Sequence, residues 1–222
     1  MKEMINNFPA FPTYNGRFVQ FADESDEAGF TITAVSSGTG DVGDDEAGGV
    51  LILSGAATTD NSGASVQGNA AKITLSSTER IRFMTKVRLS DVVESDFFAG
   101  FYETDTDPVG GLANGIYFTK ADGSARIKLV HEKATVATEL DTAVDFVANT
   151  YVTLSFEAWV EGGVGIVNCY IDGKYIGQLT VADPLASTVI MRESVFFQTG
   201  DALGTKTCRV KGLGWLQGTG LP

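Results

Sequence analysis

The segment RIRFMTKVRL at residues 80–89 alternates apolar and polar side chains with a period of two. Successive side chains of a β-strand point to opposite faces, so this segment predicts a strand with one apolar face. Such a face needs a second layer of structure to cover it. The two faces are Ile81, Phe83, Thr85, Val87 and Leu89 on one side and Arg80, Arg82, Met84, Lys86 and Arg88 on the other.

Residues 151–160, YVTLSFEAWV, repeat this alternation, and almost no stretch of the chain has a helical period. Asp-Gly steps at 122–123 and 172–173 favour tight hairpins, because glycine adopts a positive φ without steric cost. The sequence therefore predicts an all-β fold, a two-sheet antiparallel β-sandwich. Further strands are expected at 17–21, 29–35, 49–54, 64–67, 71–75, 96–103, 115–119, 125–132, 135–140, 164–171, 174–181, 189–199 and 206–216.

The first 16 residues differ from the rest, because two prolines lie among the aromatic residues Phe8, Phe11 and Tyr14. Proline cannot donate to a strand ladder, so residues 1–16 are expected to form an extended N-terminal arm. The arm could dock on its own domain or on a neighbouring subunit. Residues 17–222 are expected to form a single β-sandwich domain, and residues 36–48 are expected to form a polar, acidic loop.

The chain has 16 Lys and Arg residues against 28 Asp and Glu residues, which gives a net charge of −12. Nucleic acids and anionic membranes both attract basic surfaces, so we expect neither as a partner. No apolar run approaches the roughly 18 residues of a membrane helix, and residues 1–15 lack the apolar core of a signal peptide. We therefore expect synthesis in a cytoplasm without export by the usual route.

The two cysteines, Cys169 and Cys208, lie inside predicted strands. We expect them to be reduced and to pack as small apolar side chains. A disulfide between them is the alternative, and it would require neighbouring strands with suitable geometry.

No constellation of residues predicts a catalytic centre or a metal site. Glu24 and Asp26 lie in an acidic run that lacks the alternation of a strand, which favours a solvated turn over a glycosidase pair. Asp105 and Asp107 could bind calcium, but aspartates are also common in turns. His131 shares strand parity with apolar neighbours and is expected to be packed in the core. We therefore expect no catalytic residue, no metal and no cofactor.

A basic stripe made of Arg80, Arg82, Lys86 and Arg88 is the main electrostatic exception in this acidic chain. One interpretation is that each cation pairs with acids on neighbouring strands. The other is that this face meets an acidic protein surface. Partner-binding candidates are therefore this stripe and the aromatic residues of the arm, Phe8, Phe11 and Tyr14.

From residue 79 onward the order of segments resembles the concanavalin A-like lectin/glucanase superfamily in its laminin G-like jelly-roll form. The resemblance rests on residues 96–108, 114–130, 150–160, 167–179 and 189–200, and on a last strand, TCRVKGLGWLQ, that is similar to the closing strand of that family. The fold hosts lectins, hydrolases and structural modules, so it does not by itself imply a function.

Within that superfamily, the segments GFYETDTDP and NGIYFTKADGSARI look most similar to structural proteins of tailed-phage virions. This implies a non-enzymatic virion protein, most simply a capsid decoration (cement) protein that binds the major capsid protein and its own copies as a homo-oligomer. The alternative is a carbohydrate-binding, lectin-like module of a phage tail or fibre. Tyr102, Tyr117 and Trp159 are the aromatic residues that could stack on sugars in that case.

Overall fold

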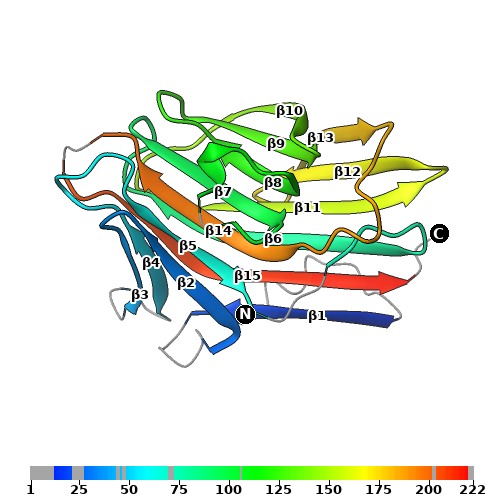
Figure 1. Cartoon of the computed structure of the whole chain (residues 1–222), viewed down its shortest axis with the longest axis horizontal. Helices are drawn as coiled ribbons and strands as arrows, with labels where there is room; N and C mark the ends of the chain where they lie inside the picture. Colours follow the sequence, from blue (N-terminus) through cyan, green and yellow to red (C-terminus); the bar gives the residue numbers. More distant parts are fainter. Residues whose placement is uncertain are drawn as a thin grey trace.

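A computed structural model describes residues 13–21, 28–43, 46, 49–69, 73–105, 107–201 and 204–219, with the side chains of residues 13–15 excepted. The described strands form two antiparallel sheets packed as a sandwich (Figure 1). This confirms the all-β, two-sheet fold. The only helix with assigned bounds in the described part is a single 3₁₀ turn, η2 (Pro108–Gly110).

The first sheet, sheet A, has the order β13-β12-β11-β6-β15-β4-β3, and β1 pairs with β15 beside β4. The second, sheet B, has the order β10-β9-β8-β7-β14-β5-β2. Sheet A contains β1 (Thr13–Gln20), β3 (Thr39–Gly43), β4 (Val50–Ser54), β6 (Glu79–Leu89), β11 (Val152–Glu161), β12 (Val164–Ile171), β13 (Lys174–Val181) and β15 (Thr207–Thr219). Sheet B contains β2 (Phe30–Val35), β5 (Gly63–Gly68), β7 (Ser95–Tyr102), β8 (Asn114–Lys120), β9 (Arg126–Lys133), β10 (Val136–Asp145) and β14 (Arg192–Thr199).

The alternation that predicted the fold also defines the core. The odd-numbered side chains of β6, from Ile81 to Leu89, are all fully buried between the sheets. At the centre, the ring of Phe156 on β11 stacks on Phe83 with centroids 5.3 Å apart. It also meets the edges of Phe101 and Phe118 from sheet B at 5.4 and 6.0 Å. The two sheets are thus joined by aromatic contacts at the middle of the sandwich.

Part of the expected N-terminal arm belongs to strand β1 of sheet A. Residues 13–16 pair with residues 216–219 of β15, so the sheet begins four residues earlier than the sequence indicated. Along the bottom of Figure 1, β1 lies against β15. Arg17 reaches from β1 to the buried Glu193 of β14, and its guanidinium also lies 4.1 Å from the ring centroid of Phe30. A charged contact therefore links the first described strand to the opposite sheet.

Two further expectations need correction. The acidic loop expected at 36–48 contains strand β3, an edge strand with one buried apolar side chain, Val42. The strand expected at 71–75 is reduced to a single bridge between Ile73 and Met191 in the described residues. In contrast, the Asp-Gly hairpin at 172–173 is as predicted, with a positive φ at both residues and Tyr170 packed edge-on against Tyr175.

Replacing Phe156 by alanine should remove the ring that joins the aromatic residues of both sheets. The expected loss is about 3–5 kcal/mol in the free energy of unfolding, because the cavity lies where neither sheet can collapse freely. Urea denaturation followed by circular dichroism measures this change. Val147→Ala, at a side chain that is 64% exposed, is the control and should change stability by less than about 0.5 kcal/mol. Equal effects of the two substitutions would contradict the central role of Phe156.

Candidate ligand-binding pocket

The outer face of sheet B carries a pocket of about 430 Å³. It lies over β8, β9 and β10, and the segment 108–112 forms one wall. A volume of this size suits a small ligand or a few units of a polymer. Its lining residues are Phe98, Pro108, Val109, Gly111, Leu112, Tyr117, Thr119, Ala121, Ser124, Arg126, Lys128, Val130, Glu132, Ala137 and Glu139.

One side of the pocket is apolar. Phe98 and Tyr117 pack with ring centroids 5.5 Å apart, and Leu112 and Val130 complete a small cluster that is separate from the main core. The side chains of Phe98, Tyr117 and Val130 point away from the core because they alternate along their strands with inward residues such as Phe97 and Phe118. The result is a firm apolar surface on the outside of the sheet.

The other side of the pocket is polar. The Tyr117 hydroxyl donates a hydrogen bond to Oε2 of Glu132, and Nζ of Lys128 lies 2.7 Å from Oε2 of Glu139. Burial, together with the contact to Glu132, raises the pKa of Tyr117 well above its ordinary value. Tyr117 therefore stays a neutral donor, and each carboxylate already has a partner.

The neighbouring part of this face, over β7, β14 and β5, is closed. Phe196 is fully buried and meets Phe98 edge-on at 6.0 Å. The Gln67 amide donates to the Ser194 hydroxyl at 3.0 Å, and both side chains are buried. These side chains are thus covered, whereas the pocket lies on the side of β8, β9 and β10.

The basic stripe is largely neutralised within sheet A. Nη2 of Arg82 lies 2.8 Å from Glu157 on the adjacent strand β11, and both side chains are buried. Arg80 lies 3.5 Å from the same carboxylate and covers the ring of Trp159 at 4.1 Å from its centroid. These contacts match the interpretation in which the cations pair with acids on neighbouring strands.

The other half of the stripe has a different environment. Arg88 pairs with Glu46 at 2.6 Å, although Glu46 precedes β4 and is not on an adjacent strand. Lys86 lies 5.6 Å from the ring centroid of Tyr151, and no ion pair joins it to a carboxylate among the residues described. The prediction of simple cross-strand pairing therefore fails at this end of β6.

The other candidate residues from the sequence lie outside the described residues or make structural contacts. Phe8, Phe11, Glu24 and Asp26 lie outside the described residues, and for Tyr14 only the backbone in β1 is described. His131 is buried as expected, with its Nε2 accepting a hydrogen bond from the amide of Leu185 at 3.3 Å. Asp105 accepts a hydrogen bond from the amide of Asp107, which is a turn contact.

The three aromatic residues considered for sugar stacking lie in three different environments. Tyr102 is fully buried, and Trp159 lies under Arg80 on sheet A. Only Tyr117 lines the pocket, and little of its surface is exposed. The cysteines are separated by β11 and β6 within sheet A and remain free thiols, so the alternative of a disulfide is excluded.

The strands that form the pocket carry a sequence pattern beyond simple alternation. In the segments 96–103, 115–119 and 125–132, apolar side chains occupy both parities, with Phe98, Tyr117 and Val130 opposite the core-facing positions. A strand with two apolar faces is covered on both sides. The pattern could therefore have indicated a covered outer face, although not the segment 108–112 that covers it.

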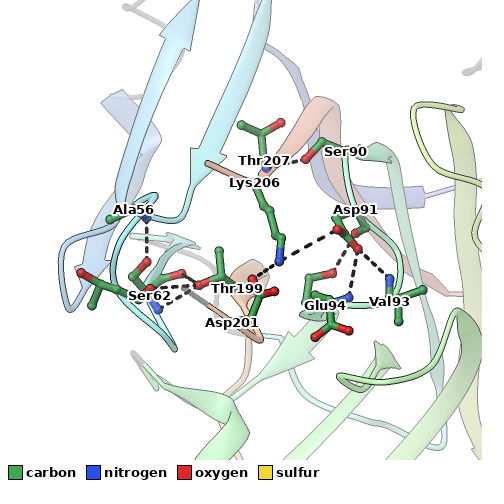
Figure 2. Close-up of polar contacts among 12 residues, drawn as sticks. Ala56, Ser62, Ser90, Asp91, Val93, Glu94, Thr199, Asp201, Lys206 and Thr207 are labelled. Atoms are coloured by element: carbon green, nitrogen blue, oxygen red, sulfur yellow. Dashed lines mark hydrogen bonds and ion pairs between the residues drawn. The ribbon is translucent and has the colours of Figure 1, made fainter. Parts of the chain in front are cut away.

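A cluster of polar and charged groups, buried or partly buried, lies at one end of the sandwich. Figure 2 shows the Lys206 ammonium between Asp201 and Asp91, 3.9 Å from the latter. In the same view, the Ser62 hydroxyl accepts a hydrogen bond from the Ala56 amide, and the backbone amide of Thr207 donates to the Ser90 hydroxyl at 2.8 Å. These contacts tie together the loops that follow β4, β6 and β14. The polar groups of this cluster contact one another, which indicates a structural role.

A second buried lysine lies beside this cluster. The Lys120 side chain has no exposed surface, and its ammonium donates to the carbonyls of Val93 and Ser95 and to the Ser95 hydroxyl. Burial lowers the pKa of Lys120 to about 8, against a partial opposing effect of nearby carboxylates such as Asp96. The ammonium of Lys120 thus titrates close to neutral pH.

No protein-family model matches the chain, and no curated protein matches it in sequence. Solved structures do match its fold. The endo-1,3-β-glucanase from Streptomyces sioyaensis superposes with a TM-score of 0.64 at 10% identity, over 96% of this chain and 100% of that one. The chain has a concanavalin A-like jelly-roll fold.

Two other jelly rolls of similar shape come from phages. The CBM2 module of the evolved Dit protein of Lactobacillus casei BL23 phage J-1 has a TM-score of 0.59 at 14% identity, over 94% of this chain and 98% of that one. A carbohydrate esterase from Shiga toxin-encoding bacteriophage phi24B has a TM-score of 0.58 at 14% identity, over 91% and 97%. At these identities the likeness establishes the jelly-roll fold and leaves ligand and reaction open.

The part of the jelly roll that the structure describes contains no helix of the length and apolar character needed to cross a bilayer. It also contains no group of three or more potential metal-ligating side chains.

The lowered pKa of Lys120 leads to a pH-dependent stability. Between a folded pKa of about 8 and an unfolded value near 10.5, the unfolded chain binds more protons at Lys120, so stability rises with pH. From pH 7 to pH 9, Lys120 should add about 1 kcal/mol to the free energy of unfolding. Urea denaturation of the wild-type protein and of Lys120→Met at both pH values isolates this contribution. The same pH dependence in both proteins would show that Lys120 is not the responsible group.

Proposed function

We propose that this jelly roll is a non-enzymatic carbohydrate-binding module of a phage particle and that it holds a short stretch of glycan in the pocket on sheet B. The observation that carries the proposal is the two-sided chemistry of this pocket. Sugar rings present apolar C–H faces and polar hydroxyl rims. The Phe98 and Tyr117 side suits the first, and Glu132, Glu139 and Lys128 suit the second.

The arrangement of the carboxylates supports binding in preference to hydrolysis. Glycosidase acids need one carboxyl group kept protonated and a second kept free for attack or for activating water. In this pocket, Glu132 accepts the Tyr117 hydroxyl and Glu139 pairs with Lys128. Partnered carboxylates of this kind make good acceptors for sugar hydroxyls. The phage origin of two structural neighbours, one a CBM2 module and one a carbohydrate esterase, supports the same assignment.

A glycan array of bacterial surface polysaccharides, followed by calorimetry on the bound glycan, tests this function. Phe98→Ala should weaken binding about tenfold, since it removes the apolar wall, which is worth on the order of 1–2 kcal/mol. Tyr117→Phe should also weaken binding, since it leaves the ring but frees the Glu132 carboxylate.

Tyr175→Ala, at an exposed tyrosine on sheet A, is the matched control and should bind like the wild-type protein. Absence of binding to every glycan at high micromolar protein would refute the proposal. Release of reducing sugars from the bound glycan would refute its non-enzymatic part.

A second candidate is the capsid decoration role, in which the protein binds the major capsid protein and its own copies on the virion. The observation that favours it is the anchoring of β1, which pairs with β15 and is tied to Glu193 through Arg17. Residues 1–12, which include Phe8 and Phe11, therefore precede a fixed strand and could clamp a neighbouring subunit. Decoration interfaces of this kind bury well over 1,000 Å² in total.

Deleting residues 1–12 should abolish attachment to capsid shells of the phage that encodes the protein, as measured by co-sedimentation. The matched control is deletion of residues 1–7, which keeps Phe8 and Phe11 and should preserve attachment. Full occupancy of the shells by the longer truncation would eliminate the arm as a capsid contact.

A further inference from the structure

One carboxylate in the pocket on sheet B differs from the other charged groups that line it. Glu132 lines the pocket from β9 and is only 8% exposed. The side chains of Lys128 and Glu139, which also line it, are 42% and 45% exposed. Removing a carboxylate from water is costly unless hydrogen bonds or an opposite charge compensate for the lost hydration. The surroundings of Glu132 therefore indicate which ligand group suits it.

Two residues of β8 hold Glu132 in place. Gly115 is directly opposite Glu132 in register, and the ring of Tyr117 lies against this glycine. A Cβ at Gly115 would lie 3.0 Å from Cδ1 of Tyr117, so the glycine leaves room for the ring. The Tyr117 hydroxyl then donates to Oε2 of Glu132. Because burial raises the pKa of Tyr117, the hydroxyl stays neutral, and it orients the carboxylate without neutralising its charge.

The cations that line the pocket have carboxylate partners of their own. Nζ of Lys128 lies 2.7 Å from Oε2 of Glu139. Nε of Arg126 lies 2.9 Å from Oδ1 of Asp145. Neither cation forms an ion pair with Glu132.

One oxygen of Glu132 is open to an outside donor. Its Oε2 accepts the Tyr117 hydroxyl, whereas no hydrogen bond or ion pair reaches its Oε1 from the residues that the structure describes. A buried acceptor without a partner is costly, and a ligand that donates to it recovers that cost. A positively charged donor gives the stronger hydrogen bond to a carboxylate.

The apolar wall narrows the choice of cation. Phe98 and Tyr117 pack beside the carboxylate with ring centroids 5.5 Å apart, and aromatic rings attract organic ammonium groups. A calcium ion needs six to eight oxygen ligands. The described part of the chain offers no group of three or more side chains suited to a metal ion. A sugar with an ammonium group matches both the aromatic wall and Glu132.

We propose that the pocket selects glycans whose sugars carry a free amino group, and that Oε1 of Glu132 accepts a hydrogen bond from the protonated amine. The inference rests on the proposed glycan-binding function and names the class of sugar. In the bound state, the C–H face of the sugar lies against Phe98 and Tyr117. An N-acetylated sugar has the same ring without the charge, so it loses the ionic contact.

The probes are chitosan and chitin oligosaccharides of equal length, which differ in that the first carries free amines and the second N-acetyl groups. Calorimetry at about pH 6 measures binding with the amines protonated. The wild-type protein should bind the chitosan probe at least about tenfold more tightly than the chitin probe. Glu132→Gln keeps the shape of the side chain and should reduce this preference to less than about twofold. Added salt should also reduce it, because the contact is ionic.

The matched control is Glu161→Gln, which makes the same change of charge at an exposed position of β11 on sheet A and should keep the preference. It separates a contact in the pocket from general attraction between a cationic glycan and an acidic protein. Thermal melts identify a variant that fails to fold, and Glu132→Ala serves in place of Glu132→Gln in that case.

Three results would overturn the inference. These are equal affinity of the wild-type protein for the two probes, binding of neither probe, or a preference that Glu132→Gln and Glu161→Gln reduce equally. If the glycan array shows binding of neutral glycans in any of these cases, the inference fails and the proposed function stands. If the array also shows no binding, both fail.

Discussion

The contact between the apolar faces of the two sheets is the constraint on which the other features depend. Each strand of an antiparallel sandwich has one face committed to the core, so every functional side chain must come from the opposite parity or from a loop. Phe156 lies at the middle of this contact and meets Phe83, Phe101 and Phe118. The outer faces of the two sheets are then free to differ, and in this protein they differ strongly.

Part of the outer face of sheet B is covered, and the pocket on this face combines apolar and polar groups. The outer face of sheet A is charged, with a buried ion pair between Arg82 and Glu157 at one end and the cations Lys86, Arg88 and Lys211 around Tyr151 at the other. The two surfaces lie on opposite sides of the sandwich, so occupancy of one does not block the other sterically.

Much of the fold could be predicted because alternation is a local property of the sequence. The faces of β6 and β11, the hairpin at Asp172 and Gly173, and the packed His131 all follow from parity and turn chemistry. Strand β3 was missed because it has only one buried apolar side chain, Val42, and lies at a sheet edge.

The sites were less predictable, because they depend on contacts between distant segments. Pairing between neighbouring strands could have indicated Glu157 as the partner of Arg82. It could not have indicated Glu46 as the partner of Arg88, because Glu46 lies in a segment before β4. The bulge in β15 at Lys211 leaves no clear sequence signature. Predicting the pocket also requires the position of residues 108–112. The alternation of side chains along β7, β8 and β9 does not indicate that position.

Strand β15 has a consequence for how the molecule is made. It pairs with β6 on one side and with both β1 and β4 on the other, so it is the piece that joins the early strands of sheet A to the later ones. On a ribosome, residues 207–219 emerge after every other described strand. Sheet A must therefore wait as two unjoined parts with unpaired edges until residues 207–219 have been made, and the acidic character of the chain helps to keep such intermediates from associating.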